Sequence, residues 1–154
     1  MMVRIHLKGL NKVTSNMGRI NRQIEEAVIN TNAIIANKIQ GEARRTVPVF
    51  EGILRKDIKV KTKNFTKSFR VTIGSTKAYA AAIEFGYNGL NRLPNLDKLR
   101  RWVISKGMPA SATYNIALKL KRKGSRAQPY LVPAFDKYVR KYADILRFKL
   151  SGVR

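Results

Sequence analysis

Two stretches of the chain alternate apolar and polar residues, which is the period-2 pattern of half-buried β-strands. Residues 2–8, MVRIHLK, predict an edge or opening strand with its apolar side chains on one side. Residues 54–74 predict a β-hairpin with one apolar face, which packs on a core, and one cationic face. The apolar residues of the hairpin are Ile58, Val60, Phe69, Val71 and Ile73.

A long amphipathic helix is predicted from about Ser15 to Thr46, because apolar residues recur there at spacings of three, four and seven. Thr31 bridges one gap in this apolar stripe. At 1.5 Å per residue, the helix would be about 45 Å long. Pro48 disfavours helix at the residue before it, and Gly52 allows a turn, so the helix ends there.

Helical spacing returns in the second half of the chain. Residues 95–107 and 111–124 predict two shorter helices, and residues 133–150 predict one closing helix. The residues that we expect to begin or end these helices are Asn95, Gly107, Ser111, Gly124 and Pro133.

These elements predict an α+β fold and a single domain spanning residues 1–154. In this fold the long N-terminal helix packs across a small antiparallel sheet, and two shorter helices and a C-terminal helix complete the chain. With 154 residues, 44% of them hydrophobic, the chain can bury a real core, about 68–70% of its unfolded surface.

The formal net charge of +23 is far above the magnitude of about 2–8 that is usual for a small domain. Residues 1–54 hold 8 basic and 4 acidic residues (+4), whereas residues 55–154 hold 24 and 5 (+19). Self-repulsion on this scale favours a polyanionic partner over a merely solvated surface. We therefore expect nucleic acid nearby.

Two basic clusters are the candidates for facing DNA. The first follows the polar face and turn of the hairpin, and the second lies at the end of a short helix. They consist of Lys59, Lys61, Lys63, Lys67 and Arg70, and of Lys119, Lys121, Arg122, Lys123 and Arg126. We favour DNA for the hairpin face, where the alternative is lysine that protects a strand edge from aggregation. For the second cluster, DNA and acidic surfaces of partner proteins both stay open.

The sequence shows no signature of catalysis or of a cofactor. The single histidine, His6, has no second histidine or cysteine to work with, and Cys is absent altogether. No Gly-rich phosphate loop is present, and the acids do not cluster: Glu25 and Glu26 are adjacent and so point in different directions on a helix. We expect no catalytic residue, no metal, no cofactor and no enzyme activity.

The first ten residues, MMVRIHLKGL, lack the continuous apolar stretch of a signal peptide. No segment approaches the roughly 18 apolar residues of a membrane span. We therefore expect a soluble protein that is made in the cytoplasm and has no membrane partner.

Glu84 lies inside the apolar run AAAIEFGY, in a chain with only nine carboxylates. An acid in this setting either has a raised pKa and takes part in proton chemistry, or holds a loop to its neighbour. The local pattern does not decide between these two roles.

Four stretches, in this order, resemble the tail-completion or neck proteins of long-tailed double-stranded DNA bacteriophages: EARRTVPVFEGILRKDIKV, AYAAAIEFGY, LPNLDKLRRWVISKG and ALKLKRKGSRAQPYLVPAF. That family carries Ala-Pro-Val-Asp-Thr-Gly-x-Leu after a long helix, then Tyr-Ala-x-x-x-Glu-Phe-Gly, then Pro-Phe-Leu-x-Pro-Ala. The resemblance covers about residues 42–136, with Phe50-Glu51 in place of Asp-Thr. The residues that carry the motifs here are Pro48, Gly52, Leu54, Tyr79, Glu84, Phe85, Gly86, Pro129, Tyr130 and Pro133.

The resemblance implies a structural virion protein, assembled in the bacterial host cytoplasm, that forms a ring at the head–tail junction. The ring, for which a hexamer is favoured, joins the tail to the DNA-filled head. Its implied partners are neighbouring neck and tail-terminator proteins and the double-stranded DNA that passes through without sequence readout. The alternatives are a sequence-independent nucleic-acid-binding protein of ribosomal or chromatin type and, less favoured, a nuclease.

The resemblance also implies roles for the residues of the second motif. Glu84 is expected to be a turn or intersubunit anchor, with an arginine as a candidate partner, rather than a catalytic acid. Phe85 is expected in the core, and Gly86 at a backbone position that tolerates φ > 0.

Overall fold

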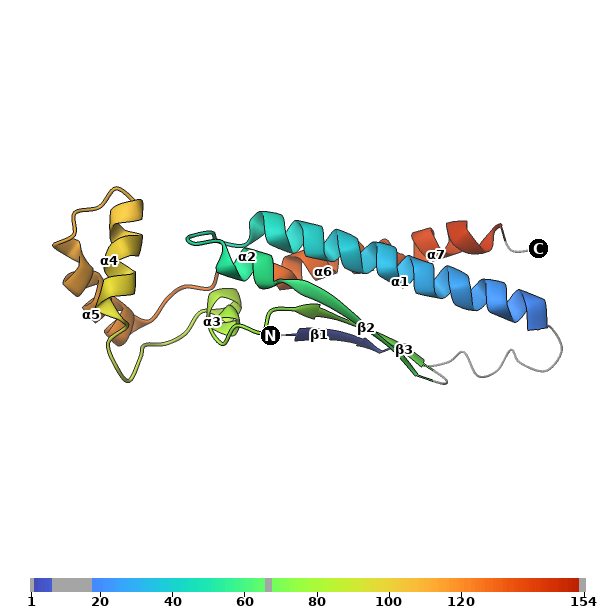
Figure 1. Ribbon diagram of the computed structural model, residues 1–154, viewed down its shortest axis with the longest axis horizontal. Coiled ribbons are helices and arrows are strands. Elements are labelled where there is room, and N and C mark those ends of the chain that lie inside the picture. The colour runs from blue at the N-terminus through green and yellow to red at the C-terminus, as the bar shows by residue number, and fades with distance from the viewer. Residues whose placement is uncertain (1, 7–17, 66–67, 153–154) are drawn as a thin grey trace.

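The computed structural model describes residues 2–6, 18–65 and 68–152, and shows an elongated α+β fold (Figure 1). The strands are β1 (Met2–His6), β2 (Lys59–Phe65) and β3 (Ser68–Gly74). The helices are α1 (Gly18–Thr46), α2 (Ile53–Asp57), α3 (Ala80–Phe85), α4 (Leu96–Ser105), α5 (Ala112–Lys123), α6 (Leu131–Val139) and α7 (Tyr142–Leu150).

The sheet is antiparallel and has the strand order β1-β3-β2, so β1 is an edge strand, as predicted. Residues 7 and 8 of the predicted first strand lie outside the described residues. Helix α1 runs along one face of the sheet, and α6 and α7 pack on α1 (Figure 1). The predicted arrangement, a long helix across a small antiparallel sheet, is confirmed.

The core forms between α1, the hairpin and α6. Ile39 of α1, Ile58 and Ile73 of the hairpin and Leu131 of α6 are all 0% exposed. Burying one such side chain contributes about 1.5–3 kcal/mol. Thr31, predicted to bridge the apolar stripe of the helix, is also buried, and its hydroxyl donates a hydrogen bond to the Ala27 carbonyl at 2.7 Å.

Side chains of α1 also hold the start of β2. Gln40 Nε2 and Arg44 Nη2 each donate a hydrogen bond to the Ile58 carbonyl oxygen at 2.8 Å, and Arg44 Nε donates to the same oxygen at 3.2 Å. Because this carbonyl accepts three hydrogen bonds from α1, the start of β2 is fixed against the helix. The cationic face of the hairpin is thereby held on the side away from α1.

Two predicted element boundaries are wrong. Residues 133–150 are not one helix, because the chain turns at Arg140 and Lys141 between α6 and α7. This turn lets both helices contact α1. The hairpin is also shorter than predicted, because residues 54–57 belong to α2, which buries Leu54 in the core.

The two shorter helices begin where the sequence indicated, but only one of them has a side-chain cap. Asn95 accepts a hydrogen bond from the Lys98 amide at 2.9 Å and caps α4. Ser111 occupies the N-cap position of α5 with helical dihedral angles and makes no side-chain cap hydrogen bond.

Candidate nucleic-acid interface

The face of the sheet that is turned away from α1 carries the hairpin cations. Residues directly opposite each other in an antiparallel pair share a face. The register pairs Lys61 with Thr72 and Lys63 with Arg70, so these four residues lie on one face. Lys59, two residues before Lys61, continues the row.

The lysines of this row are exposed, whereas Arg70 on the central strand is half-buried. Every second residue of a strand recurs at about 6.8 Å. Two base-pair steps of B-DNA also rise about 6.8 Å along the helix axis. The row of Lys59, Lys61 and Lys63 therefore suits contact with phosphates of a duplex backbone. Lys67 lies outside the described residues.

The tertiary structure adds two positions to this face that the sequence alone did not assign. Strand β1 pairs with β3 so that Arg4 lies opposite Thr72 and His6 opposite Arg70. Both register positions belong to the cationic face. Sequence reasoning missed them because alternation within β1 could not show which strand it would pair with.

The second basic cluster lies on a separate helical hairpin, which we call the arm and define as residues 92–126. It contains α4 and α5, which pack on each other and extend beyond the end of the sheet (Figure 1). Val103 of α4 and Ala117 of α5 are both 0% exposed and form its small core. The hairpin face and the 119–126 cluster thus lie in different parts of the molecule.

The base of the arm is fixed by backbone hydrogen bonds. Tyr87 and Ser125 each donate an amide hydrogen bond to the carbonyl of the other at 3.0 Å. Gly86 and Gly124 flank this bridge, both with φ of 71°. A Cβ at Gly86 would lie 2.6 Å from the Ser125 carbonyl oxygen, so glycine is required there for the close approach of the two strands as well as for its positive φ.

Glu84 is 1% exposed and caps the start of α6 from a distant part of the chain. Its carboxylate accepts backbone hydrogen bonds from Tyr130 at 3.0 Å, Leu131 at 2.9 Å and Val132 at 2.9 Å. The first amides of a helix lack partners within the helix, and its dipole favours negative charge there. The partners of Glu84 are therefore backbone amides of α6, where the sequence suggested an arginine.

The other motif residues divide into buried and exposed ones. Leu54 and Tyr130 belong to the core, and Gly52 has the left-handed backbone that its turn requires, with φ of 73°. Phe85, which the sequence placed in the core, is 60% exposed. This prediction was wrong because α3 directs its neighbour Glu84 inward, and one short helix cannot bury two successive residues on the same side. The remaining motif residues, all exposed, are Pro48, Tyr79, Pro129 and Pro133.

Two groups in this region have large pKa shifts. Hydrogen bonds from the Ser75 hydroxyl and the Thr76 amide lower the pKa of Asp57 to about 2. Burial, with a smaller effect of the Glu84 charge, raises the pKa of Tyr130 to about 12. The Tyr130 hydroxyl is buried with no hydrogen-bond partner in the described part of the chain. The pKa shift of Asp57 thus follows from hydrogen bonds, and that of Tyr130 from burial.

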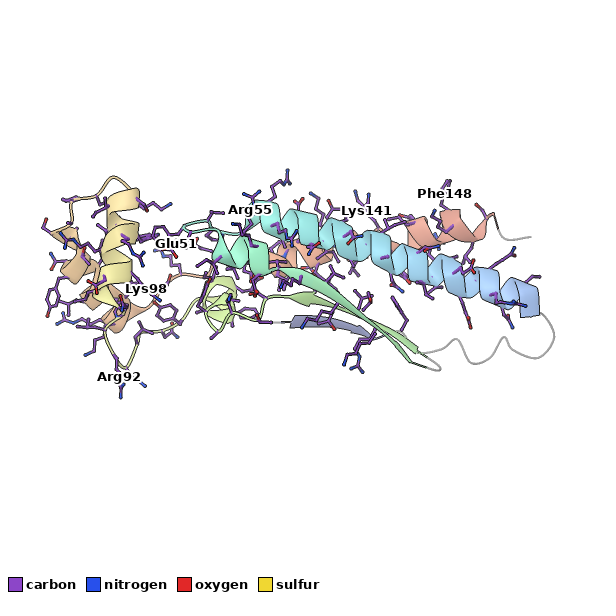
Figure 2. All side chains as sticks on the ribbon, in the orientation of Figure 1. Glu51, Arg55, Arg92, Lys98, Lys141 and Phe148 are labelled. Carbon is purple, nitrogen blue, oxygen red and sulfur yellow. The ribbon has the colours of Figure 1, made fainter. Side chains whose placement is uncertain are left out.

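An apolar groove lies where the arm meets the body of the molecule. It has a volume of about 470 Å³ and is lined from the body by Phe50, Ile53 and Tyr79 and from the arm by Leu99 and Trp102. Glu51, between the arm and α2 in Figure 2, lies 3.7 Å from Arg101. Exposed apolar side chains gathered in this way are typical of protein contact surfaces.

Within residues 2–6, 18–65 and 68–152, no three acidic or histidine side chains gather as a metal site would require. Over the same residues, no helix has the length and hydropathy needed to cross a membrane.

Residues 11–86 match the model of a protein family described as "Bacteriophage HK97-gp10, putative tail-component". This match, over 76 of the 154 residues, supports a relation to bacteriophage tail components. The matched region contains α1, α2, the hairpin and α3, so it includes the cationic sheet face and Glu84, and it ends before the arm. Comparison with curated proteins and with solved structures found no match.

The match supports a structural tail protein, and a tail-component family implies a place in the virion and interaction with other phage structural proteins. It also agrees with the resemblance drawn from the sequence motifs. The arm, β1, α6 and α7 lie outside the matched residues.

Proposed function

We propose that this tail component forms a ring at the head–tail junction, joins the tail to the DNA-filled head, and lets DNA pass. The observation that carries the proposal is the family match over residues 11–86, which include α1, α2, the hairpin and α3. The apolar groove supports assembly with other structural proteins, because such surfaces are rarely left open on monomers. In this proposal the protein has no enzyme activity, and its ring consists of copies of the same chain, with a hexamer favoured.

The exposed lysine row of β2 supports the part of the proposal that concerns DNA. A ring repeats the sheet face around its axis and so presents a cationic collar to the duplex. Lysine contacts to phosphates act by counterion release, weaken with salt and read no bases. Such contacts can hold DNA in place and still allow it to slide during ejection.

The joining role is tested with particles that lack this protein. We expect full heads and finished tails that do not assemble into infectious joined virions. Restoring the protein to extracts of such particles should restore joining, and electron microscopy of the purified protein should show rings. Normal infectivity without the protein would overturn the joining role.

The high charge also favours a second candidate function, a sequence-independent nucleic-acid-binding protein outside the virion. In this function the protein would be a monomer, and its exposed cations would bind DNA or RNA. Mass measurement separates the two: monomers that bind nucleic acid, together with normal particles in the absence of the protein, would favour this second function.

A further inference from the structure

The arm concentrates positive charge to a degree that its fold does not require. Residues 92–126 hold ten basic residues and a single acidic one, Asp97, which gives a formal charge of +9 in 35 residues. All ten basic side chains are exposed. They are Arg92, Lys98, Arg100, Arg101, Lys106, Lys119, Lys121, Arg122, Lys123 and Arg126.

Contacts within the protein account for only a small part of this charge. Among the described residues, the arm makes one ion pair, between Arg101 and Glu51 at 3.7 Å, and this pair is exposed. Lys121, Arg122 and Lys123 lie in the last turn of α5, where cations favour the helix dipole by a few tenths of a kcal/mol each. The basic residues of α4 and its preceding loop have no such explanation, and Arg92 projects from the arm into solvent (Figure 2).

The arm also has the construction of a rigid projection. Its helices pack on each other, and the Tyr87–Ser125 bridge closes its base. A further amide hydrogen bond, from Leu90 to the Lys121 carbonyl at 2.9 Å, ties the incoming strand to the end of α5. Because of these bonds, the two chain segments at the base of the arm are held together, next to the basic end of α5.

We propose that the arm is a second DNA-binding surface, which holds the phosphate backbone of double-stranded DNA independently of the sheet face. The proposal extends the proposed function, because it assigns the arm to the duplex that passes the ring, but DNA binding by the arm does not require ring formation.

The charge of the arm is similar to the charge of a DNA duplex over the length of α5. Helix α5 has 12 residues and is therefore about 18 Å long. A duplex offers one negative charge per about 1.7 Å of axis, so it presents roughly ten phosphate charges over this length. The charge of +9 on the arm is of the same size.

The composition of the arm favours DNA over an acidic protein surface. Protein–protein interfaces are depleted in lysine at their centre. Five of the ten cations of the arm are lysines, and only one carboxylate lies among them. Interfaces with DNA are the class that is much more positively charged.

The test compares two variants of the full-length protein that lose the same charge. The arm variant changes Lys119, Lys121, Arg122 and Lys123 to Gln. The control variant changes Arg140, Lys141, Arg147 and Lys149 to Gln, which are exposed residues of the α6–α7 region. Affinity for two 30-base-pair duplexes of unrelated sequence is measured by fluorescence anisotropy at several salt concentrations.

We expect the arm variant to bind both duplexes about tenfold or more weakly near 0.1 M salt. Its plot of log affinity against log salt should be flatter by up to about 3.6, since each lost phosphate contact removes about 0.9 from the slope. The control variant should change affinity far less. Equal losses in the two variants would overturn the proposal, because overall charge alone would then explain the binding.

The outcomes also separate this proposal from the proposed function. If the arm variant binds DNA like the unchanged protein but no longer attaches to tails or heads, the arm docks an acidic protein and the proposal fails. If the arm variant loses DNA affinity while the protein proves dispensable for joining heads to tails, the arm proposal stands and the proposed function fails. Thermal melting of both variants shows that the fold is intact.

Discussion

At the scale of single residues, Glu84 shows how a buried acid can be structural. Its carboxylate lies inside an apolar segment and accepts three amide hydrogen bonds at the start of α6. Hydrogen bonds to a charged group contribute about 1.5–3 kcal/mol each, and they are not additive. The acid thus joins α3 to α6 across more than 40 residues of sequence.

We expect Glu84→Gln to destabilise the fold by about 1–3 kcal/mol, because the amide is neutral and its NH₂ group opposes the amide donors of α6. For a chain of this size each kcal/mol lowers the melting temperature by about 2–4 °C. Chemical and thermal denaturation measure the loss, and assembly yield should fall with it. Glu51→Gln, at an exposed acid, is the control; an unchanged melting temperature for Glu84→Gln would contradict the capping role.

Tyr130 occupies the position at which the family motif carries Phe. Its hydroxyl is buried with no hydrogen-bond partner among the described residues, and an unsatisfied buried polar group costs about 1–3 kcal/mol. We therefore expect Tyr130→Phe to leave stability unchanged or to raise it. Urea denaturation measures the difference, and a loss of more than about 1 kcal/mol would show that the hydroxyl has a favourable partner.

Asp57 links stability to acidic pH. Its pKa is lowered from 3.8 to about 2 in the folded protein by hydrogen bonds from Ser75 and Thr76. A lowered pKa means that its contribution to stability is present above pH 3.8 and is lost as the pH falls towards 2. In melting experiments Asp57→Asn should be less stable than the unchanged protein at pH 5–7, and the difference should shrink between about pH 4 and 2. A difference that stays constant down to pH 2 would contradict this assignment.

At the scale of elements, two chain segments without regular secondary structure connect the arm to the body. Residues 86–90 run beside residues 121–125, and backbone hydrogen bonds join the two segments at Tyr87–Ser125 and Leu90–Lys121. Gly124 approaches the Tyr87 carbonyl so closely that a Cβ would overlap with it. The base of the arm therefore depends on close backbone geometry at Gly86 and Gly124.

The same Gly→Ala change should have opposite effects at two positions. Gly124→Ala should destabilise the base of the arm, because Ala adds strain at positive φ and a clash with Tyr87. Gly41→Ala, in α1 with open space around it, should stabilise by up to about 1 kcal/mol through helix propensity. Hydrogen exchange of the amides at 87–90 and 121–125 measures the effect on the arm. Faster exchange in both variants, or in neither, would contradict the steric explanation.

At the scale of the whole molecule, two cationic surfaces lie in different parts of the chain. The lysine row of β2 lies on the body, in the part of the chain that matches the family, while the +9 arm lies outside that match. The lysine row and the arm can thus be tested separately.

Changing Lys59, Lys61 and Lys63 together to Gln should weaken DNA binding equally for all sequences. It should flatten the dependence of log affinity on log salt by up to about 2.7, and leave ring formation intact. Changing Lys38, Lys141 and Lys149 to Gln removes the same charge elsewhere and is the control. If DNA binding is unchanged in the first variant while attachment to a partner protein is lost, the sheet face docks protein and the collar is wrong.

The sequence by itself determined the parts of this protein that depend on local periodicity. The stripe of α1, the alternation of the hairpin and the cap at Asn95 all lie within short stretches, where geometry relates neighbours directly. For this reason the α+β class and the cationic strand face were predictable, whereas the phage family was indicated by the resemblance of the sequence motifs.

Only the tertiary structure decided which distant segments meet. The partners of Glu84, the pairing of β1 with β3 and the separation of the arm depend on contacts between residues far apart in sequence, and no local pattern encodes them. The exposure of Phe85 and the turn at Arg140 were mispredicted for the same reason. A helical or apolar pattern shows which residues can be buried, whereas burial itself is set by the surface against which the element finally packs.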